Sequence, residues 1–232
     1  MRKVKYNWLP DFVYGGIDGA VTTYAVVAGV VGANLSTPII LILGFANLLA
    51  DGFSMAVGKY SSDSAEIERI AHIRKSEEES IITKPKEEKE EIRKILKNWG
   101  FRGEDLSRAQ AVITGNPKIW VKMMLNHEFN IIEENVNPRK GATYTFLAFI
   151  LIGLIPLLGY VSQTLTGLKE EDLFVGTSIA TLFALFLVGT VKSRFSSRHW
   201  LFTGLQTALI GGFAAALAYL VGDVLGDLLN VS

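Results

Sequence analysis

The chain has 232 residues, of which 49% are hydrophobic and 20% are charged, and its formal net charge is zero. A balanced charge argues against nucleic acid as a partner, and the absence of cysteine excludes disulfides, thiolate metal sites and thiol redox chemistry. The charges are segregated, because long uncharged stretches alternate with charged ones. This segregation predicts a multi-pass integral membrane protein in a lipid bilayer.

Five apolar stretches are long enough to cross a bilayer, which takes about 20 residues as a helix. We therefore expect an all-α membrane protein with five transmembrane helices. The stretches are Phe12 to Ala33, Pro38 to Val57, Gly141 to Leu168, Leu173 to Val191 and Trp200 to Val221.

Most of the remaining charge lies between the second and third stretches, from about Lys59 to Lys140. This block is too polar to enter lipid, so it predicts a helical domain inserted between helices two and three. The predicted organisation is transmembrane helices one and two over residues 1–61, the insert over residues 62–137, and helices three to five over residues 138–232.

Lys and Arg in the short loops predict the orientation, because loops rich in these residues stay in the cytoplasm. Basic residues precede the first span and separate the fourth span from the fifth, whereas the loop from Asn34 to Thr37 has none. We therefore expect the N-terminus and the insert in the cytoplasm and the C-terminus outside. The compact chain, with no evident targeting extension, indicates a prokaryotic cell membrane.

Two carboxylates fall inside the first two spans. Asp18 lies in the middle of the first, and the second carries Asn47, Asp51 and Met55 at steps of four residues, on one helix face. A carboxylate at hydrocarbon depth costs roughly 2.5 to 3.5 kcal/mol on insertion scales, so it usually marks an ion or proton path. An amide oxygen, a carboxylate and a thioether together suit Fe²⁺ or Mn²⁺ better than Ca²⁺ or Mg²⁺. The alternative is structural, with Asp18 bonded to a neighbouring helix and Met55 serving only in packing.

Small residues recur along the first span, at Gly15, Gly19, Ala25 and Gly29. Such residues let two helix backbones approach closely in lipid, so they predict a helix–helix seam. Glycine is also common in membrane spans without such a role.

Four helices are expected in the insert, and the first of them continues the second span. Their predicted ranges are Ser61 to about Ile82, Pro85 to Gly100, Glu104 to Thr114, and a last helix that Asn116 caps and that stops before Asn137. Glu88 and Glu91 share one face of the second helix, so they can converge with Glu128 and with acids of the first helix around divalent ions. Interleaved Glu and Lys also fit an ordinary solvated helix.

The run Asp18-Gly19, followed by Ala50-Asp51-Gly-Phe-Ser54-Met55-Ala-Val-Gly58-Lys-Tyr60 and an acidic helix, resembles the vacuolar iron transporter and nodulin-like family. The resemblance covers nearly the whole chain and implies a homodimer whose first spans meet at the two-fold axis. It also implies export of Fe²⁺ or Mn²⁺ from the cytoplasm in exchange for protons, with Asp18 and Met55 as transport residues. Where some members have a Glu, this chain has Asn47, with Asp51 one turn later, which leaves the preferred metal open.

Family members with such an insert bind metal through helix carboxylates and a Met. The matching run here is Trp120-Val-Lys-Met123-Met124-Leu125-Asn-His127-Glu128, so the resemblance implies Met124 and Glu128 as ligands. It also implies Glu77, Glu88 and Glu91, and a further acid that falls on Ser80 unless the register shifts to Glu79. No permanently bound cofactor is expected, because Fe²⁺ or Mn²⁺ would be the transported and regulatory-site ion.

Two rival functions are consistent with parts of the sequence. A membrane-bound di-iron ferroxidase would pair Glu with a His three residues later, and none of His72, His127 and His199 has an acid at that offset. A passive divalent cation channel stays open as an alternative, although no filter loop is evident. A proton-coupled metal antiporter is what the resemblance implies, and an enzyme is not expected.

Overall fold

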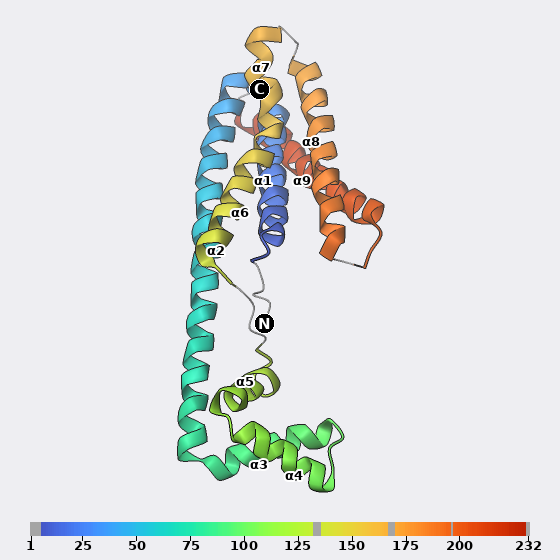
Figure 1. Ribbon diagram of the computed structural model, residues 1–232. Coiled ribbons are helices and arrows are strands. Elements are labelled where there is room, and N and C mark those ends of the chain that lie inside the picture. Colours follow the sequence, from blue (N-terminus) through green and yellow to red (C-terminus); the bar gives the residue numbers. More distant parts are fainter. Residues whose placement is uncertain (1–5, 132–135, 167–169, 196, 231–232) are drawn as a thin grey trace. The chain divides into compact units, whose positions relative to one another are not determined.

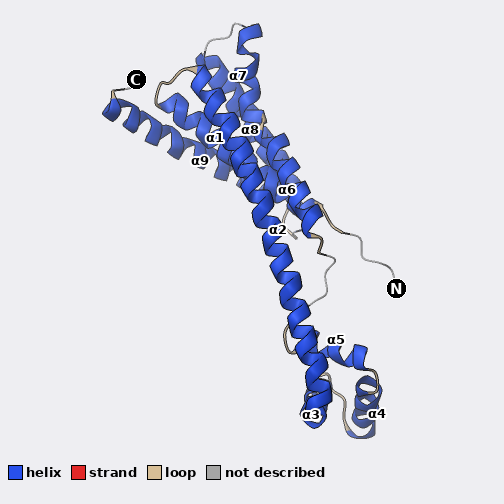
Figure 2. Cartoon of the chain, turned by 90° about the vertical axis from the view of Figure 1, so that its left-hand side faces the viewer, coloured by secondary structure: helices blue, strands red, loops and turns tan. Residues whose placement is uncertain are grey.

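The computed structural model describes residues 6–131, 136–166, 170–195 and 197–230, and every regular element in these ranges is helical (Figures 1 and 2). The chain divides into two compact units, which we describe separately. The bundle consists of Tyr6–Ser61 and Asn137–Ser232, and the insert is Ser62–Val136. The elements are α1 (Leu9–Gly32), α2 (Thr37–Thr83), α3 (Pro85–Asn98), α4 (Gly103–Thr114), α5 (Pro117–His127), α6 (Pro138–Gly153), α7 (Ile155–Thr166), α8 (Glu170–Lys192), the 3-10 turn η1 (Ser193–Phe195) and α9 (Trp200–Leu229).

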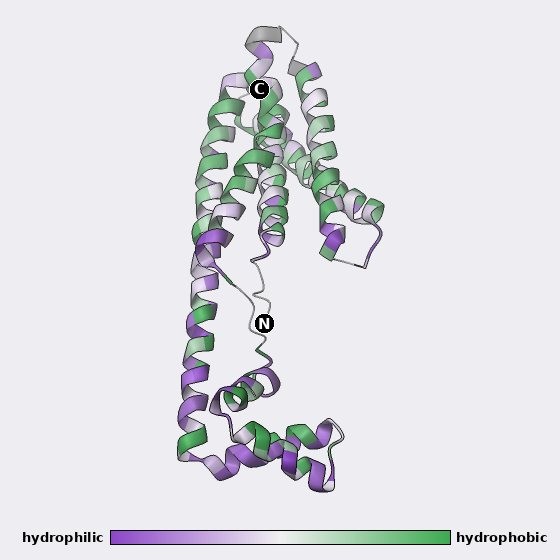
Figure 3. Cartoon of the chain, viewed as in Figure 1, coloured by the Kyte–Doolittle hydropathy of each residue, from purple (hydrophilic) through white to green (hydrophobic). Residues whose placement is uncertain are grey.

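Membrane-spanning character is concentrated in the bundle, where hydrophobic residues dominate the helices, whereas hydrophilic residues dominate the insert (Figure 3). In the described part of the chain, four helical segments are long and apolar enough to cross a membrane. They lie within Leu9–Gly32, Thr37–Thr83, Asp172–Phe195 and Trp200–Leu229. These results confirm the prediction of an all-α, multi-pass membrane protein.

The third predicted span differs from the expectation of one continuous helix. It consists of α6 and α7, which together pass the same length and hydropathy test but are bent by 43° at the break between them. Pro156 lies in the first turn of α7 and has no N–H to continue the hydrogen-bond ladder of α6. The predicted end of this span, Leu168, falls outside the described residues.

Helix α1 packs against α6 at backbone distance. A Cβ atom at Gly15 would overlap the carbonyl oxygen of Thr145, and a Cβ at Gly19 would overlap that of Phe149. Close packing of this kind holds helices together in lipid, where the hydrophobic effect between helices is absent. The seam predicted from the small residues of the first span therefore exists, and it joins two helices of the same chain.

Helix α9 makes a second close contact with α1, near the other end of that helix. A Cβ at Gly32 would overlap the Tyr219 carbonyl oxygen, and a Cβ at Gly222 would overlap that of Gly29. Since α6 and α9 use the glycines of α1 within one chain, these glycines give no evidence for the predicted contact between the first spans of two subunits.

Helix α2 joins the bundle mainly through side chains. The space beside Gly44 is filled by the Leu157 side chain, and that beside Gly52 by the rings of Phe146 and Phe149. Leu48, one turn from each glycine, is 1% exposed. Side-chain packing of this type leaves more distance between helix axes than the glycine contacts of α1.

The insert has an apolar core of its own, formed by α3, α4, α5 and the second part of α2. Asn116 caps α5 by accepting a hydrogen bond from the backbone N–H of Ile119 at 3.3 Å, as its position before Pro117 predicts. The core residues form two groups, Ile92, Leu96, Leu106, Trp120, Met123 and Met124, and Val121, Leu125 and Ile131 with Ile70, Ile73 and Ile81 of α2.

Candidate functional site

The carboxylates of the first two spans lie opposite one another in the bundle. Asp18 of α1 and Asp51 of α2 are both half-buried, and each lies within electrostatic range of the other. The hydroxyl of Thr22, one turn beyond Asp18, donates to the Asp18 backbone carbonyl at 2.8 Å and leaves the carboxylate free of that bond. The fold thus brings together two acids that are 33 residues apart in sequence.

Asn47 and Met55 flank Asp51 on α2, one turn to either side. The amide nitrogen of Asn47 is buried and has no hydrogen-bond partner among the described residues. Met55 is half-buried and packs against the apolar core of the bundle. An amide, a carboxylate and a thioether therefore follow one another along the α2 face that carries Asp51. We call these three residues together with Asp18 the polar pathway, after the transport role predicted for them from the sequence.

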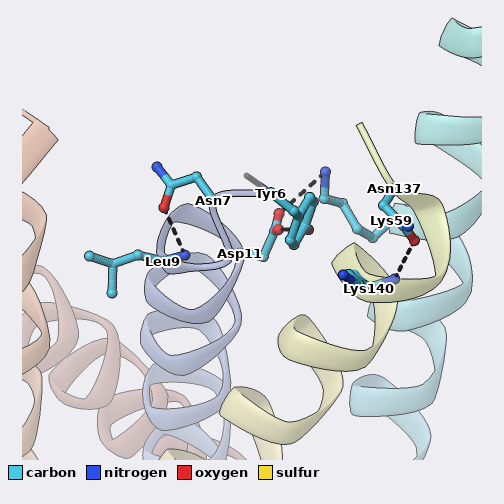
Figure 4. Close-up of polar contacts among 7 residues, drawn as sticks. All are labelled: Tyr6, Asn7, Leu9, Asp11, Lys59, Asn137 and Lys140. Atoms are coloured by element: carbon cyan, nitrogen blue, oxygen red, sulfur yellow. Dashed lines mark hydrogen bonds and ion pairs between the residues drawn. The ribbon is translucent and has the colours of Figure 1, made fainter. Parts of the chain in front are cut away.

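Sequence reasoning missed a charged pair at the start of α1. The Lys59 ammonium lies 3.3 Å from a carboxylate oxygen of Asp11, and the Tyr6 hydroxyl donates to the other carboxylate oxygen (Figure 4). Asp11 precedes Asp18 by seven residues and Lys59 follows Met55 by four. The same helical spacing that singled out Asn47, Asp51 and Met55 would have revealed both residues.

The insert gathers carboxylates from three helices. Glu77 of α2 faces Glu88 and Glu91 of α3 and Glu128 at the end of α5, since all three act electrostatically on it. Burial and these three like charges raise the pKa of Glu77 to about 7. One of its carboxylate oxygens is buried without a hydrogen-bond partner among the described residues. A cation would relieve both the repulsion and the missing contact.

The neighbouring glutamates respond to the same crowding. Burial, followed by the charges of Glu91 and Glu87, raises the pKa of Glu88, and burial followed by Glu91 and Glu88 raises the pKa of Glu128. We call Glu77, Glu88, Glu91 and Glu128 the insert carboxylate cluster. Because the pKa of Glu77 is about 7, this acid is suited to exchange a proton for a divalent cation near neutral pH.

Two other predicted ligands lie in different surroundings. Glu79 is exposed, on the side of α2 away from Glu77, whereas Ser80 is half-buried one turn after Glu77. Met124 is fully buried in the apolar core of the insert. Within the described ranges, no three His, Asp or Glu side chains are close enough to hold a metal ion as they stand.

A family model described as the VIT family matches residues 9–223 of this chain. The chain belongs to the VIT family. Among similar proteins, Vacuolar iron transporter 1 of Arabidopsis thaliana is 32% identical over 217 residues, which cover 92% of this chain and 84% of that protein. The Vacuolar iron transporter of Toxoplasma gondii is 32% identical over 225 residues, which cover 94% of this chain and 74% of that protein. The Vacuolar iron transporter of Plasmodium falciparum is 31% identical over 230 residues, which cover 97% of this chain and 84% of that protein.

VIT family membership confirms the resemblance seen in the sequence, and it identifies the chain as a transporter rather than an enzyme. The ferroxidase alternative is therefore set aside. The three relatives come from eukaryotes and are named for the vacuole, so the expected prokaryotic cell membrane gains no support from them and stays a prediction.

Proposed function

We propose that this VIT family member transports Fe²⁺, Mn²⁺ or both out of the cytoplasm in exchange for protons. The observation that carries the proposal is the opposition of Asp18 and Asp51 on two membrane-spanning helices. Two carboxylates at such a depth are costly unless they bind a cation or protons. The names of the relatives, which specify iron, support the choice of a transition metal.

In the proposed mechanism, the polar pathway alternates between two occupants. A divalent ion, partly dehydrated, binds between Asp18 and Asp51 with Met55 as a softer ligand, and protonation of the acids on the far side releases it. The protons then return with the empty carrier. Because the same acids hold either metal or protons, the two fluxes are coupled in opposite directions.

The insert carboxylate cluster acts as the capture and regulatory site in this proposal. Glu77 has a pKa of about 7, so it exchanges a proton for a cation within the physiological pH range. Fe²⁺ and Mn²⁺ accept carboxylate oxygen as well as softer ligands. Glu79 and Met124 stay as further proposed ligands, which side-chain or helix rearrangement would have to bring to the metal.

The proposal includes the topology expected from the sequence. It has five spans, with α6 and α7 counted as one. The N-terminus and the insert lie in the cytoplasm and the C-terminus lies outside, a proposal supported by the Lys and Arg of the short loops. It also includes the homodimer, without the glycines of α1 as its interface. Cross-linking of the purified protein in detergent measures the number of subunits directly.

Metal flux into liposomes that contain the purified protein tests the function. An imposed pH gradient should drive Fe²⁺ or Mn²⁺ against its own gradient, and the Asp18→Asn variant should lose this flux while remaining folded. The matched control is Asp223→Asn, which changes an exposed Asp of α9. Flux that only follows the metal gradient would indicate the passive channel, and wild-type flux by Asp18→Asn would remove Asp18 from the pathway.

A further inference from the structure

The ion pair between Asp11 and Lys59 ties the first turn of α1 to α2 within the bundle. The two side chains are 11% and 28% exposed, and the charged atoms are 3.3 Å apart. The Tyr6 hydroxyl donates to the second carboxylate oxygen of Asp11, so both oxygens of this carboxylate are engaged (Figure 4). Lys140 adds a further positive charge nearby, with its ammonium 5.9 Å from the centre of the Tyr6 ring.

This ion pair lies in register with the polar pathway. Asp11 and Asp18 are two helical turns apart on α1, or about 10 Å along its axis, and therefore share a helix face. Lys59, Met55 and Asp51 follow one another at four-residue steps on α2. The two faces that bring Asp18 opposite Asp51 thus bring Asp11 opposite Lys59, at the end of the pathway that lies toward the N-terminus of α1.

We propose that Asp11 and Lys59 form a gate at this end of the polar pathway. The inference rests on the proposed metal transport. While the pair is formed, α1 and α2 are held together and a fixed ammonium stands on the route to Asp18 and Asp51. The ammonium also neutralises the Asp11 carboxylate, which would otherwise attract an approaching divalent cation. Entry of the ion therefore requires Lys59 to leave Asp11 and the two helices to separate at this level.

A reversible cross-link tests whether the pair must open. The chain has no cysteine, so Asp11→Cys with Lys59→Cys provides one defined pair of thiols. The control cross-link joins two positions of α1 alone, Asp11→Cys with Tyr14→Cys. Joining the helices with a bifunctional thiol reagent that a reductant cleaves should lower metal flux into liposomes by about tenfold or more, and reductant should restore it.

The outcomes of this experiment separate the gate from the transport function. Undiminished flux through fully cross-linked protein, with the α1 control equally active, would show that the pair is static and overturn the gate. Absence of flux in the wild-type protein would instead overturn the proposed function. If Asp11→Cys alone abolishes flux, the gate is tested instead by the rate at which a thiol inside the polar pathway is labelled.

Thiol accessibility uses Thr22→Cys, one turn beyond Asp18, as the reporter. Lys59→Met keeps an unbranched side chain that is one atom shorter and removes the charge. It should raise the rate of labelling at position 22 about tenfold by releasing the gate. Lys140→Met removes a neighbouring ammonium that contacts the Tyr6 ring, and it should leave the rate unchanged. No change with Lys59→Met, or equal acceleration by both variants, would overturn the gate.

Discussion

Gly19 of α1 lies so close to the backbone of Phe149 in α6 that a side-chain Cβ would overlap the Phe149 carbonyl oxygen. Gly19→Ala should therefore destabilise the bundle by about 1 to 3 kcal/mol, because the two backbones must move apart. Gly58→Ala is the matched control, since no atom lies within 4 Å of a Cβ at that helical position. It should be neutral or stabilising by up to about 1 kcal/mol. Thermal unfolding in detergent measures both effects, and equal stability of the two variants would contradict the packing described here.

Met55→Leu tests the thioether in the polar pathway. The exchange nearly conserves volume, so the melting temperature should change little, whereas metal flux should fall by about tenfold if the sulfur binds the ion. Met123→Leu, in the core of the insert, is the control for a Met that serves only in packing. Equal flux in the two variants would assign Met55 to packing as well.

The stability of the insert should depend on pH through Glu77. Its pKa in the folded protein is about 7, above the ordinary value of 4.5. Between these values the folded insert binds more protons than the unfolded chain, so its stability is greatest below the ordinary value and falls as pH rises toward 7. The expected loss is about 1 to 3 kcal/mol.

Glu77→Gln should abolish most of this pH dependence, because the amide cannot ionise. Glu79→Gln, which changes an exposed acid two residues along the same helix, should retain it. The comparison is made by denaturing residues 62–136, expressed alone, at pH 5 and pH 8. The apolar core of the insert predicts that this segment folds independently. If the stability of the Glu77→Gln variant depends on pH as much as that of the wild type, another group binds the proton responsible.

Metal should stabilise the insert through the same cluster. Saturating Mn²⁺ or Fe²⁺ should raise the melting temperature by mass action, and binding should weaken as pH falls below about 7, because protons compete for the carboxylates. Replacing Glu88 and Glu91 together by Gln should lower the affinity by about tenfold or more. Replacing Glu78 and Glu90 by Gln removes the same charge from exposed positions of α2 and α3 and should change the metal affinity little. If calorimetry finds the same metal affinity before and after the double replacement of Glu88 and Glu91, these glutamates belong to an ordinary solvated helix face and do not bind the metal.

The helices of this chain could be predicted from the sequence because their signals are local. Segregated charge located the apolar spans, and Asn116 with Pro117 marked the start of α5. The break at Pro156 was not predicted, because proline is tolerated in membrane helices and its effect depends on how neighbouring helices satisfy the backbone. The helices that pack against the α1 glycines could not be predicted either, because a small residue permits close packing without specifying which helix packs against it.

In the candidate site, as in the fold, local spacing predicts some features, whereas others depend on how the helices pack. The four-residue steps of α2 placed Asn47, Asp51 and Met55 on one face, but only the fold brings Asp18 opposite Asp51. In the insert, interleaved Glu and Lys could not distinguish a solvated surface from a shared site. The distinction comes from the burial of Glu77, which requires α3 and α5 to pack on α2.

The contrast between the glycine contacts of α1 and the side-chain contacts of α2 has a mechanical consequence. Contacts between backbones have no flexible atoms to yield, so α1, α6 and α9 form a rigid frame. Side chains at the α2 contacts can change rotamer, so α2 is more able than α6 or α9 to slide or tilt against α1. In the proposed transport cycle, one helix would then move against a fixed frame, with Asp18 stationary and Asp51, Met55 and Lys59 displaced together.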